Sequence, residues 1–431
     1  MQIILGIIAL SFLIIVHEFG HFIVAKLSDI KVKEFSLFMG PKLFSFQRGE
    51  TAYSIRTIPL GGFVSMEGEE QESSDERAFN KKPILVRMAV IAAGAIMNLI
   101  AAIIIIAIVF SSRGYSTNKI SSVTKDSPAY KAGIMENDKL IKFNGKSVFN
   151  SVDFSIFSYA TKDKPVKIGL QRGNKRFTKT VIPLKHPAEA RYLLGFQAKS
   201  ISGPDSNVVD KVSAGSAAEK VGLKSNDRIT GLNDVAIKNK TDISNFLAVN
   251  KGNMVKVTVL RGGKPLVLGS ASPTEQKTPE YYETGINGFA NAKSGIAETI
   301  KQSFIFTYST ARSVFYSLAY LVSRKISPRE MMGPVGIVNT IGDVVQQSPS
   351  FSDKLIGLLF ITAFLSVNLG VFNLFPFPAL DGSKIVLLAI EAIRRKALPP
   401  EREAFINMVG FVLLIMLMIF ATSNDIIRLF S

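Results

Sequence analysis

The chain of 431 residues contains no cysteine, no tryptophan and only three histidines. Without cysteine it can form no disulfide, no cysteine-ligated zinc ribbon and no iron-sulfur cluster, and it has no cysteine nucleophile. Any bound metal must therefore be held by histidine and carboxylate side chains. Two of the three histidines, His17 and His21, stand four residues apart.

Apolar and charged residues occupy different stretches of the chain. Hydrophobic residues make up 47% of the sequence and the mean hydropathy is +0.26, although 20% of the residues are charged. This composition excludes a disordered or collagen-like chain. The formal net charge is +17, but no nucleic-acid recognition motif accompanies it, so we expect no nucleic-acid partner.

Four stretches are apolar enough to cross the hydrocarbon core of a bilayer, which takes about 20 residues. They predict transmembrane helices over residues 1–27, 88–112, 354–381 and 404–424. The loops 28–87 and 382–403 carry clustered lysines and arginines, which predicts that both are cytoplasmic. Both termini and the long segment between the second and third helices are then expected outside the cytoplasm.

The long segment contains an internal duplication. A shift of 89 residues aligns residues 127–175 with 216–264 without a gap, and 17 of the 49 positions are identical. Each copy predicts a short helix ending at a glycine, a turn with an aspartate, a strand, a second helix and an alternating strand.

This order of elements resembles tandem PDZ domains of the circularly permuted bacterial type, expected over residues 115–190 and 191–275. Leu194, Gly195 and Phe196 resemble the carboxylate-binding loop of the second domain, whereas no such loop is evident ahead of the first. PDZ domains bind peptide ends by strand addition. The alternative is a pair of spacer domains with empty or blocked grooves, and the sequence leaves both interpretations open.

The first apolar stretch contains the motif His17-Glu18-Phe19-Gly20-His21. On a helix, residues four apart lie on one face, so two imidazoles can bind one metal while the glutamate lies beside a bound water. Imidazole and carboxylate ligands suit zinc. The alternative is a chance motif, but ionisable residues within an apolar helix are costly unless they have a partner or a role. The motif therefore predicts a zinc-dependent peptide hydrolase.

The third apolar stretch ends in the sequence Asn373 to Gly382, which contains Pro376, Pro378 and Asp381. Two prolines at this spacing prevent a regular helix, which a membrane tolerates only where protein satisfies the freed backbone groups. Asp381 is the favoured third metal ligand. The alternative is that it caps the cytoplasmic helix that follows.

Together, H-E-F-G-H in the first helix, N-x-x-P-x-P-x-L-D-G in the third and the duplicated domains resemble the RseP-type bacterial site-2 proteases, which are intramembrane zinc metalloproteases. The resemblance covers essentially the whole chain. It implies a polytopic α-helical protein of the bacterial inner membrane, with four transmembrane helices and two mixed α/β PDZ-like domains between helices 2 and 3. Ser383-Lys384 and Ala95 depart from the usual family pattern, and neither departure removes a ligand.

The resemblance also implies roles for individual residues. His17, His21 and Asp381 would bind Zn²⁺ and Glu18 would be the general base. Substrate would contact the following residues of the third helix and of a membrane-associated β-loop over residues 55–64: Asn368, Asn373, Gly61, Gly62 and Phe63. The alternative for the β-loop is an ordinary cytoplasmic hairpin.

Residues 296–322 have apolar residues at helical spacing but also Lys301 and Arg312. They are counted either as a fifth span or, as we favour, as an amphipathic helix on the outer membrane surface within an extracytoplasmic segment 290–350.

The expected function is cleavage of single-pass transmembrane substrates within the bilayer. The resemblance implies a pre-trimmed anti-sigma factor of the envelope stress response and remnant signal peptides, with both termini and the PDZ pair in the periplasm. The PDZ pair would exclude substrates whose outer domain is still attached. The alternative function is a non-catalytic membrane adaptor that senses peptide ends through its PDZ domains and holds a structural zinc.

Overall fold

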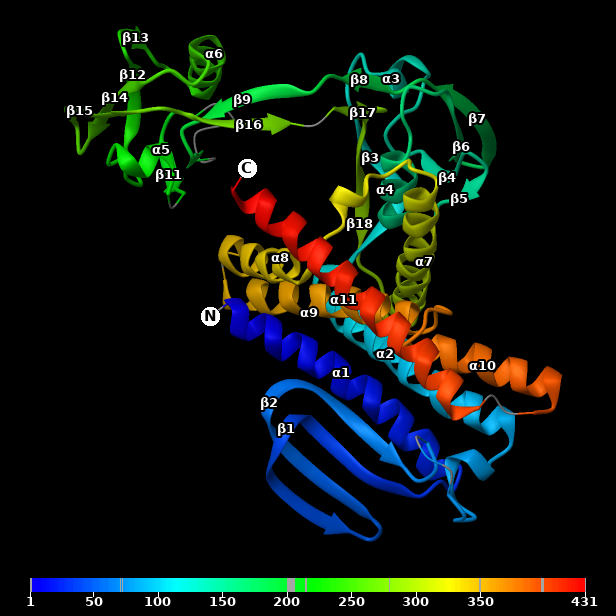
Figure 1. Cartoon of the computed structure of the whole chain (residues 1–431). Helices are drawn as coiled ribbons and strands as arrows, with labels where there is room; N and C mark the ends of the chain where they lie inside the picture. Colours follow the sequence, from blue (N-terminus) through cyan, green and yellow to red (C-terminus); the bar gives the residue numbers. More distant parts are fainter. Residues whose placement is uncertain are drawn as a thin grey trace. The chain divides into compact units, whose positions relative to one another are not determined.

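The structure, a computed structural model, describes residues 2–69, 71, 73–199, 206–213, 215–278, 280–348, 350–396 and 399–430. The chain divides into two compact units. The first comprises Met1–Ile182 and Thr284–Phe430, and the second is Pro183–Glu283 (Figure 1). The second unit is therefore inserted into the first.

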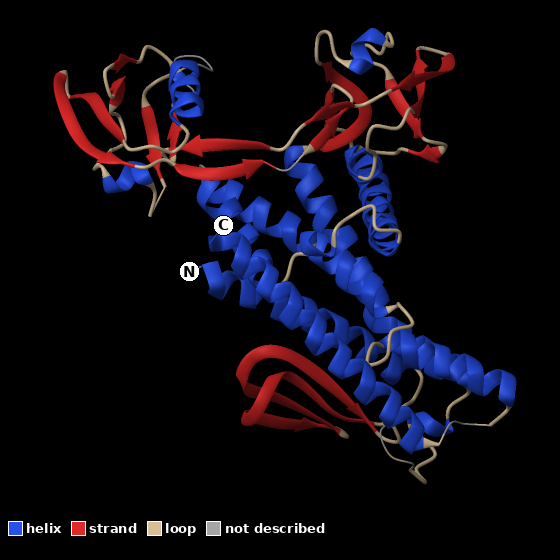
Figure 2. Ribbon diagram, turned by 45° about the horizontal axis from the view of Figure 1, so that its top comes forward, coloured by secondary structure: helices blue, strands red, loops and turns tan. Residues whose placement is uncertain are grey.

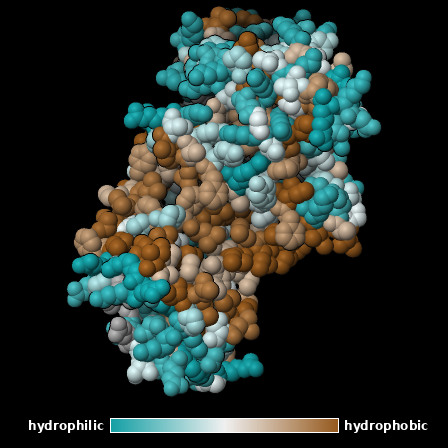
Figure 3. Space-filling view, turned by 90° about the vertical axis from the view of Figure 1, so that its right-hand side faces the viewer, coloured by the Kyte–Doolittle hydropathy of each residue, from teal (hydrophilic) through white to brown (hydrophobic). Residues whose placement is uncertain are grey.

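The described residues contain four helices that are long and apolar enough to cross a membrane. These are α1 (Gln2–Leu27), α2 (Ile84–Arg113), α9 (Phe351–Asn373) and α11 (Pro400–Phe430). Four helices were expected, but α9 ends at Asn373 and not at residue 381, because the two prolines prevent its continuation. One face of the molecule shows a band of hydrophobic side chains between hydrophilic regions (Figure 3).

Small residues allow the backbones of α1, α2 and α9 to approach one another closely. A Cβ atom at Gly20 of α1 would lie 2.4 Å from the carbonyl oxygen of Ala93 on α2. A Cβ atom at Gly370 of α9 would lie 2.9 Å from the carbonyl oxygen of Ala95 on α2. Such contacts are the usual means of helix association within a membrane, and here they bring the middle of α2 close to both α1 and α9.

A bent sheet lies beside α1 (Figure 2). It consists of β1 (Val32–Arg48) and β2 (Thr51–Met66), which pair in an antiparallel manner. Both strands fold back on themselves, so that Ser36 pairs with Ser54 on one side and with Phe63 on the other. The Ser11 hydroxyl of α1 donates a hydrogen bond to the carbonyl oxygen of Pro59 (2.6 Å), which holds β2 against the helix.

The first repeat forms a six-stranded sheet in the order β18-β3-β4-β6-β7, with β5 paired to β4. Its strands are β3 (Tyr115–Val123), β4 (Lys139–Phe143), β5 (Lys146–Ser147), β6 (Val166–Arg172), β7 (Lys175–Val181) and β18 (Ile286–Ala292). Helices α3 (Pro128–Lys131) and α4 (Ser151–Tyr159) complete it. The edge strand β18 follows the second repeat in sequence, so the expected range 115–190 does not contain the whole sheet.

The second unit contains the second repeat and a two-stranded connection to it. The repeat consists of β10 (Phe196–Ala198), β11 (Val209–Val212), α5 (Ala217–Lys220), β12 (Arg228–Leu232), β13 (Val235–Ala236), α6 (Lys240–Asn250), β14 (Val255–Arg261) and β15 (Lys264–Ala271). The connection pairs β8 (Leu184–His186) with β17 (Tyr281–Glu283) and β9 (Glu189–Leu193) with β16 (Thr274–Thr278).

The two repeats share their buried polar contacts as well as their order of elements. Arg172 donates two hydrogen bonds to Asp138 (2.7 and 2.8 Å), and Arg261 donates two to Asp227 (both 2.7 Å). Burial opposes the charge of each aspartate, but these bonds outweigh it and lower the pKa of both carboxyls. The sequence duplication is therefore a structural duplication.

The remaining helices are the 3-10 turns η1 (Phe79–Lys81) and η3 (Pro328–Glu330), and α7 (Ile296–Val322), α8 (Pro334–Gln347) and α10 (Asp381–Arg394). Helix α7 is not among the four membrane-length apolar helices. It packs against α2 and α9, and also against α4 of the first repeat, where Arg312 forms an ion pair with the buried Asp153. Helix α7 therefore ties the first repeat to the apolar helices.

Candidate metal centre

His17 and His21 lie one helical turn apart on the buried side of α1. Their relative exposures are 7% and 9%, and residues at i and i+4 project from the same face of a helix. Gly94 of α2 faces both rings. A Cβ atom at this position would lie 2.4 Å from His21 Nε2 and 2.7 Å from His17 Cε1. The glycine therefore leaves the space that the two imidazoles occupy.

Asp381 reaches the histidines from the irregular segment that follows α9. It is the first residue of α10, whose N-cap is Leu380, so Asp381 does not occupy the N-cap position. Ala379 has a positive φ of 72°. A Cβ atom at residue 382 would lie 2.1 Å from the carbonyl oxygen of Phe375, so the tight turn requires Gly382. The proline segment thus folds back and directs the carboxylate toward α1.

The three side chains form a compact set of metal-binding atoms. His17 Nε2 lies 3.0 Å and His21 Nε2 lies 3.4 Å from Asp381 Oδ2, and the two nitrogens are 3.2 Å apart. A tetrahedral zinc site with bonds of about 2.0–2.1 Å has ligand atoms about 3.3 Å apart. Apart from these two ring nitrogens, the buried Asp381 Oδ2 has no partner within the described part of the chain. These residues therefore fit a zinc ion, with one coordination position left for water or substrate.

Neighbouring groups on α2 set the orientation of both rings. The Nδ1 atom of His21 lies 2.8 Å from the carbonyl oxygen of Val90, which makes Nδ1 the donor and leaves Nε2 unprotonated for a metal. The Asn98 amide lies 3.3 Å from His17 Nδ1. Asn98 is fully buried, and its Oδ1 has no partner among the described residues. Exchanging the two amide atoms would let Oδ1 accept a bond from His17 Nδ1–H.

Glu18 lies between the two histidines in sequence and next to β2 in space. Its Oε2 accepts a hydrogen bond from the backbone N–H of Val64 (3.1 Å). A Cβ atom at Gly62 would lie 3.8 Å from Glu18 Cγ. The strand therefore approaches the carboxylate closely enough to hold it in one orientation.

The two asparagines of α9 differ in their relation to the centre. The Asn373 amide lies 3.4 Å from both ring nitrogens of His17, so this residue joins the site. The Asn368 amide instead donates to the carbonyl oxygen of Phe364 (2.7 Å) on its own helix. Asn368 lines a separate cavity of about 390 Å³ between α4, α7 and α9.

The expected β-loop residues lie on β2 next to α1. Gly61 has a positive φ of 78°, which favours glycine, and both Gly61 and Gly62 are buried. The Phe63 ring packs under the guanidinium of Arg56, whose Cζ lies 4.9 Å from the ring centroid. These residues therefore lie beside the helix that carries the histidines.

A turn in the second unit contains Leu194, Gly195 and Phe196. These residues are distant in sequence from the proposed metal ligands. The Leu194 carbonyl accepts from Ala218 N–H (2.7 Å) and the Gly195 carbonyl accepts from Ser213 N–H (2.9 Å). Gly195 has a φ of 86°, and a Cβ atom there would lie 2.3 Å from Ser216 Cβ.

The first repeat has a matching turn that sequence reasoning missed. The Thr284 carbonyl accepts from Ala129 N–H (2.8 Å), and the Gly285 carbonyl accepts from Thr124 N–H (2.9 Å). Gly285 has a φ of 89° and lies against Ser127, the counterpart of Ser216. The signal is present in the sequence as Tyr282-x-x-Gly285, which matches Tyr192-x-x-Gly195. This motif follows the second repeat in sequence. In a tandem arrangement, the loop of the first domain would instead precede the first repeat.

A cavity of about 480 Å³ opens beside Asp381, between the first turn of α10 and α11. Leu380, Lys384, Asn407 and Phe411 contribute to its lining. Asp381 itself also lines this cavity.

Comparison with known proteins gives a consistent result. A model of peptidase family M50 matches residues 5–417. Over 428 residues the chain is 33% identical to a Clostridium perfringens protein provisionally described as a zinc metalloprotease, with 99% of each chain covered. It is 30% identical over 448 residues to the zinc metalloprotease RasP of Shouchella clausii, with 100% of each covered. It is 28% identical over 439 residues to the regulator of sigma-W protease RasP of Bacillus subtilis, with 98% of each covered.

Proposed function

This chain belongs to peptidase family M50 and is an integral membrane zinc metalloprotease of the site-2 type, and we propose that it cleaves single-pass transmembrane proteins within the bilayer. The observation that carries the proposal is the convergence of His17, His21 and Asp381 next to helices of membrane length. Ionisable groups at that depth are costly and are retained for a function.

We propose that His17, His21 and Asp381 hold the zinc and that Glu18 is the general base. When bound, the zinc acidifies water and polarises the scissile carbonyl. The Glu18 carboxylate takes a proton from the attacking water and delivers it to the leaving amine. Its hydrogen bond from Val64 N–H keeps the carboxylate oriented for both transfers.

Substrate must be extended before its backbone can reach these groups. The segment Pro59–Val64 lies along α1 and contacts Glu18 through Val64, so it supports an unwound substrate at the reacting peptide bond. The Asn373 amide, which is close to His17, is positioned to donate to the substrate carbonyl. Asn368 acts further along α9, where it lines a cavity with residues of α7.

The proposed substrates are a membrane-anchored anti-sigma factor trimmed on its outer side and remnant signal peptides. The name of the Bacillus subtilis relative, a regulator of sigma-W protease, supports the first of these. The proposed location is the bacterial inner membrane, with both termini and the two repeats in the periplasm, because the clustered basic residues lie in the other loops. The repeats are proposed to be PDZ-like modules that exclude substrates with a folded outer domain.

The test is cleavage of a single-pass transmembrane peptide in proteoliposomes by the purified full-length protein. We expect cleavage within the apolar span, loss of cleavage with Glu18→Gln and no effect of Glu136→Gln, a control at an exposed glutamate of the first repeat. A peptide that Glu18→Gln cuts as fast as the wild type would contradict the proposed base. An inert wild type that still captured the peptide through the repeats would favour the adaptor.

A further inference from the structure

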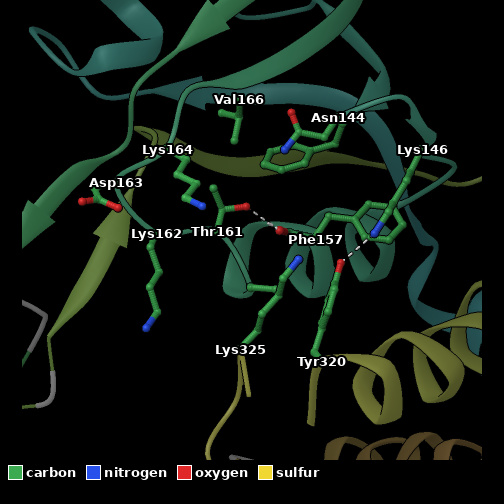
Figure 4. A pocket seen from close by; sticks show the side chains of 12 residues that line it. Asn144, Lys146, Phe157, Thr161, Lys162, Asp163, Lys164, Val166, Tyr320 and Lys325 are labelled. Atoms are coloured by element: carbon green, nitrogen blue, oxygen red, sulfur yellow. Dashed lines mark hydrogen bonds between the residues drawn. The ribbon is translucent and has the colours of Figure 1, made fainter. Parts of the chain in front are cut away.

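A pocket of about 370 Å³ lies where the first repeat meets the end of α7, and no role in proteolysis is proposed for it. Lys146 of β5, Lys164 of the loop before β6 and Lys325 after α7 contribute to it (Figure 4). Lys164 and Lys325 point into the pocket, whereas Lys162 points away from it. The aromatic rings of Phe157 and Tyr320 line the pocket between these lysines.

Lys146 is half-buried and has only neutral partners. Its ammonium group donates to the Tyr320 hydroxyl (2.8 Å) and lies 4.0 Å from the ring centroid of Tyr316 and 4.9 Å from that of Phe157. Burial lowers the pKa of Lys146, and the charge of Arg312 lowers it further. Arg312 itself is already paired with Asp153. Among the described residues, the positive charge of Lys146 therefore has no counter-ion.

The other two ammonium groups around the pocket, those of Lys164 and Lys325, are exposed and also lack a carboxylate partner in the described structure. Within the described residues, Lys146, Lys164 and Lys325 form no ion pair with a carboxylate, although Asp163 is adjacent to Lys164 in sequence. Asp163 points away from the pocket (Figure 4). Three cations that surround one cavity repel one another unless an anion occupies it.

The second repeat shows that the fold does not require this cluster. Its equivalent face carries Phe246 and Asp242, the counterparts of Phe157 and Asp153, and encloses a cavity of about 500 Å³. Val235 lines this cavity in place of Lys146, and Asn253 occupies the sequence position that corresponds to Lys164. Lys238 also lines the second cavity, at the position of Phe149, so it is the lysines at positions 146 and 164 that are particular to the first repeat, the one that α7 joins to α2 and α9.

We propose that this pocket binds the phosphate group of an acidic phospholipid headgroup. A phosphate oxygen accepts from several ammonium groups at once, and basic pockets next to membrane helices bind such headgroups. Helix α7 carries Tyr320 and packs against two helices of membrane length, so the pocket lies on a part of the protein that is fixed to the membrane-spanning region. Headgroup binding would anchor the first repeat to the membrane surface.

The test is native mass spectrometry of the full-length protein in an uncharged detergent, titrated with short-chain phosphatidylglycerol or with phosphatidylcholine of the same chain length. We expect the wild type to prefer phosphatidylglycerol. Lys146→Val, which copies the second repeat, and Lys164→Ala should each weaken this binding about fivefold. Lys162→Ala is the matched control and should leave it unchanged.

Equal binding of both lipids, or unchanged phosphatidylglycerol binding by the Lys146→Val/Lys164→Ala double variant, would overturn the proposal. Inorganic phosphate that displaces the lipid at equal concentration would preserve the phosphate chemistry and overturn the lipid assignment. Because Lys164 is exposed, Lys164→Ala tests the pocket even if replacement of Lys146 disturbs the fold.

Discussion

The orientation of each imidazole depends on residues that are not metal ligands. Asn98 is fully buried on α2, and its amide lies 3.3 Å from His17 Nδ1. Its backbone carbonyl also accepts from the Ser366 hydroxyl of α9 (2.8 Å). The backbone at Asn98 is therefore held by a contact between two helices, and its side-chain amide can fix which nitrogen of His17 carries the proton.

Asn98→Leu should weaken zinc binding by about 10- to 100-fold, because the His17 Nδ1–H loses its acceptor. Asn98→Asp should retain most of the affinity, since a carboxylate oxygen can accept the same bond. The measurement is zinc affinity by competition with a chelator of known strength. Ile96→Ala, at an exposed position of the same helix, is the control. Wild-type affinity in the leucine variant would show that Asn98 has no part in the centre.

The sequence alone indicated the histidines, Glu18 and Asp381, because polar residues are conspicuous in apolar stretches. The structure places the three proposed ligands together. Gly94 and Asn98 were not found. They lie within a run of 25 uncharged residues, where apolar positions on every side of the helix conceal which face is buried. Close approach of α1 to α2 gives both residues their importance, and one sequence does not show that approach.

Ion pairs join the structural elements around the site where α1 leads into β1. Glu50, in the turn between β1 and β2, accepts from Lys26 at the end of α1 (2.7 Å) and from Arg77 (2.6 Å). Arg77 also pairs with Asp29 (2.7 Å). The hydrogen bonds from Arg77 and then from Lys26 lower the pKa of Glu50 from 4.5 to about 2.

A lowered pKa in the folded state means that the Glu50 charge stabilises the fold above pH 4.5 and that this contribution is lost as the pH falls toward 2. The unfolding temperature of the wild type should therefore exceed that of Glu50→Gln at pH 6, and the difference should shrink as the pH is lowered below 4.5. Glu76→Gln, at an exposed neighbouring position, should behave like the wild type. A difference between wild type and Glu50→Gln that does not change with pH would contradict the assignment.

The composition of the sequence predicted where the long helices lie better than it predicted where they end. Runs of apolar residues predicted all four long helices, but hydropathy alone did not show that α9 stops at Asn373. The prolines at 376 and 378 indicated an irregular segment, yet its return toward α1 depends on Gly382 and on Gly410 of α11, which lies against Pro378. These are tertiary contacts, and periodicity contains no information about them.

At the scale of the whole molecule, one repeat is inserted into the other. Strand β18 and the turn at Gly285 complete the first repeat only after the second has been traversed. The duplication was visible in the sequence because one constant shift aligns the two copies without a gap. The insertion was not, since β18 has few identities with its counterpart β10 and is separated from the rest of its sheet by the second unit.

Because the second repeat is an insertion, a single deletion can remove it from the chain. His186 pairs with Tyr281 in the β8–β17 ladder, so residues 187–280 can be replaced by an Asn-Gly turn without separating the paired strands. We expect this protein to bind zinc, to cut pre-trimmed substrate and also to cut substrate that retains its outer domain. The measurement is a blot for intact and cut substrate, with Glu18→Gln in the same background as the control. Continued rejection of untrimmed substrate would show that the second repeat is not the filter.

The central claim is that His17, His21 and Asp381 hold one zinc for which Glu18 is the base. Metal content of the purified full-length protein, measured by inductively coupled plasma mass spectrometry, tests it most directly. We predict about one zinc per chain in the wild type and in Glu18→Gln, and far less in Asp381→Asn, because a neutral amide is a poor replacement for a carboxylate ligand. Asp343→Asn, at an exposed position of α8, should remain loaded. Full zinc occupancy in Asp381→Asn would contradict the account.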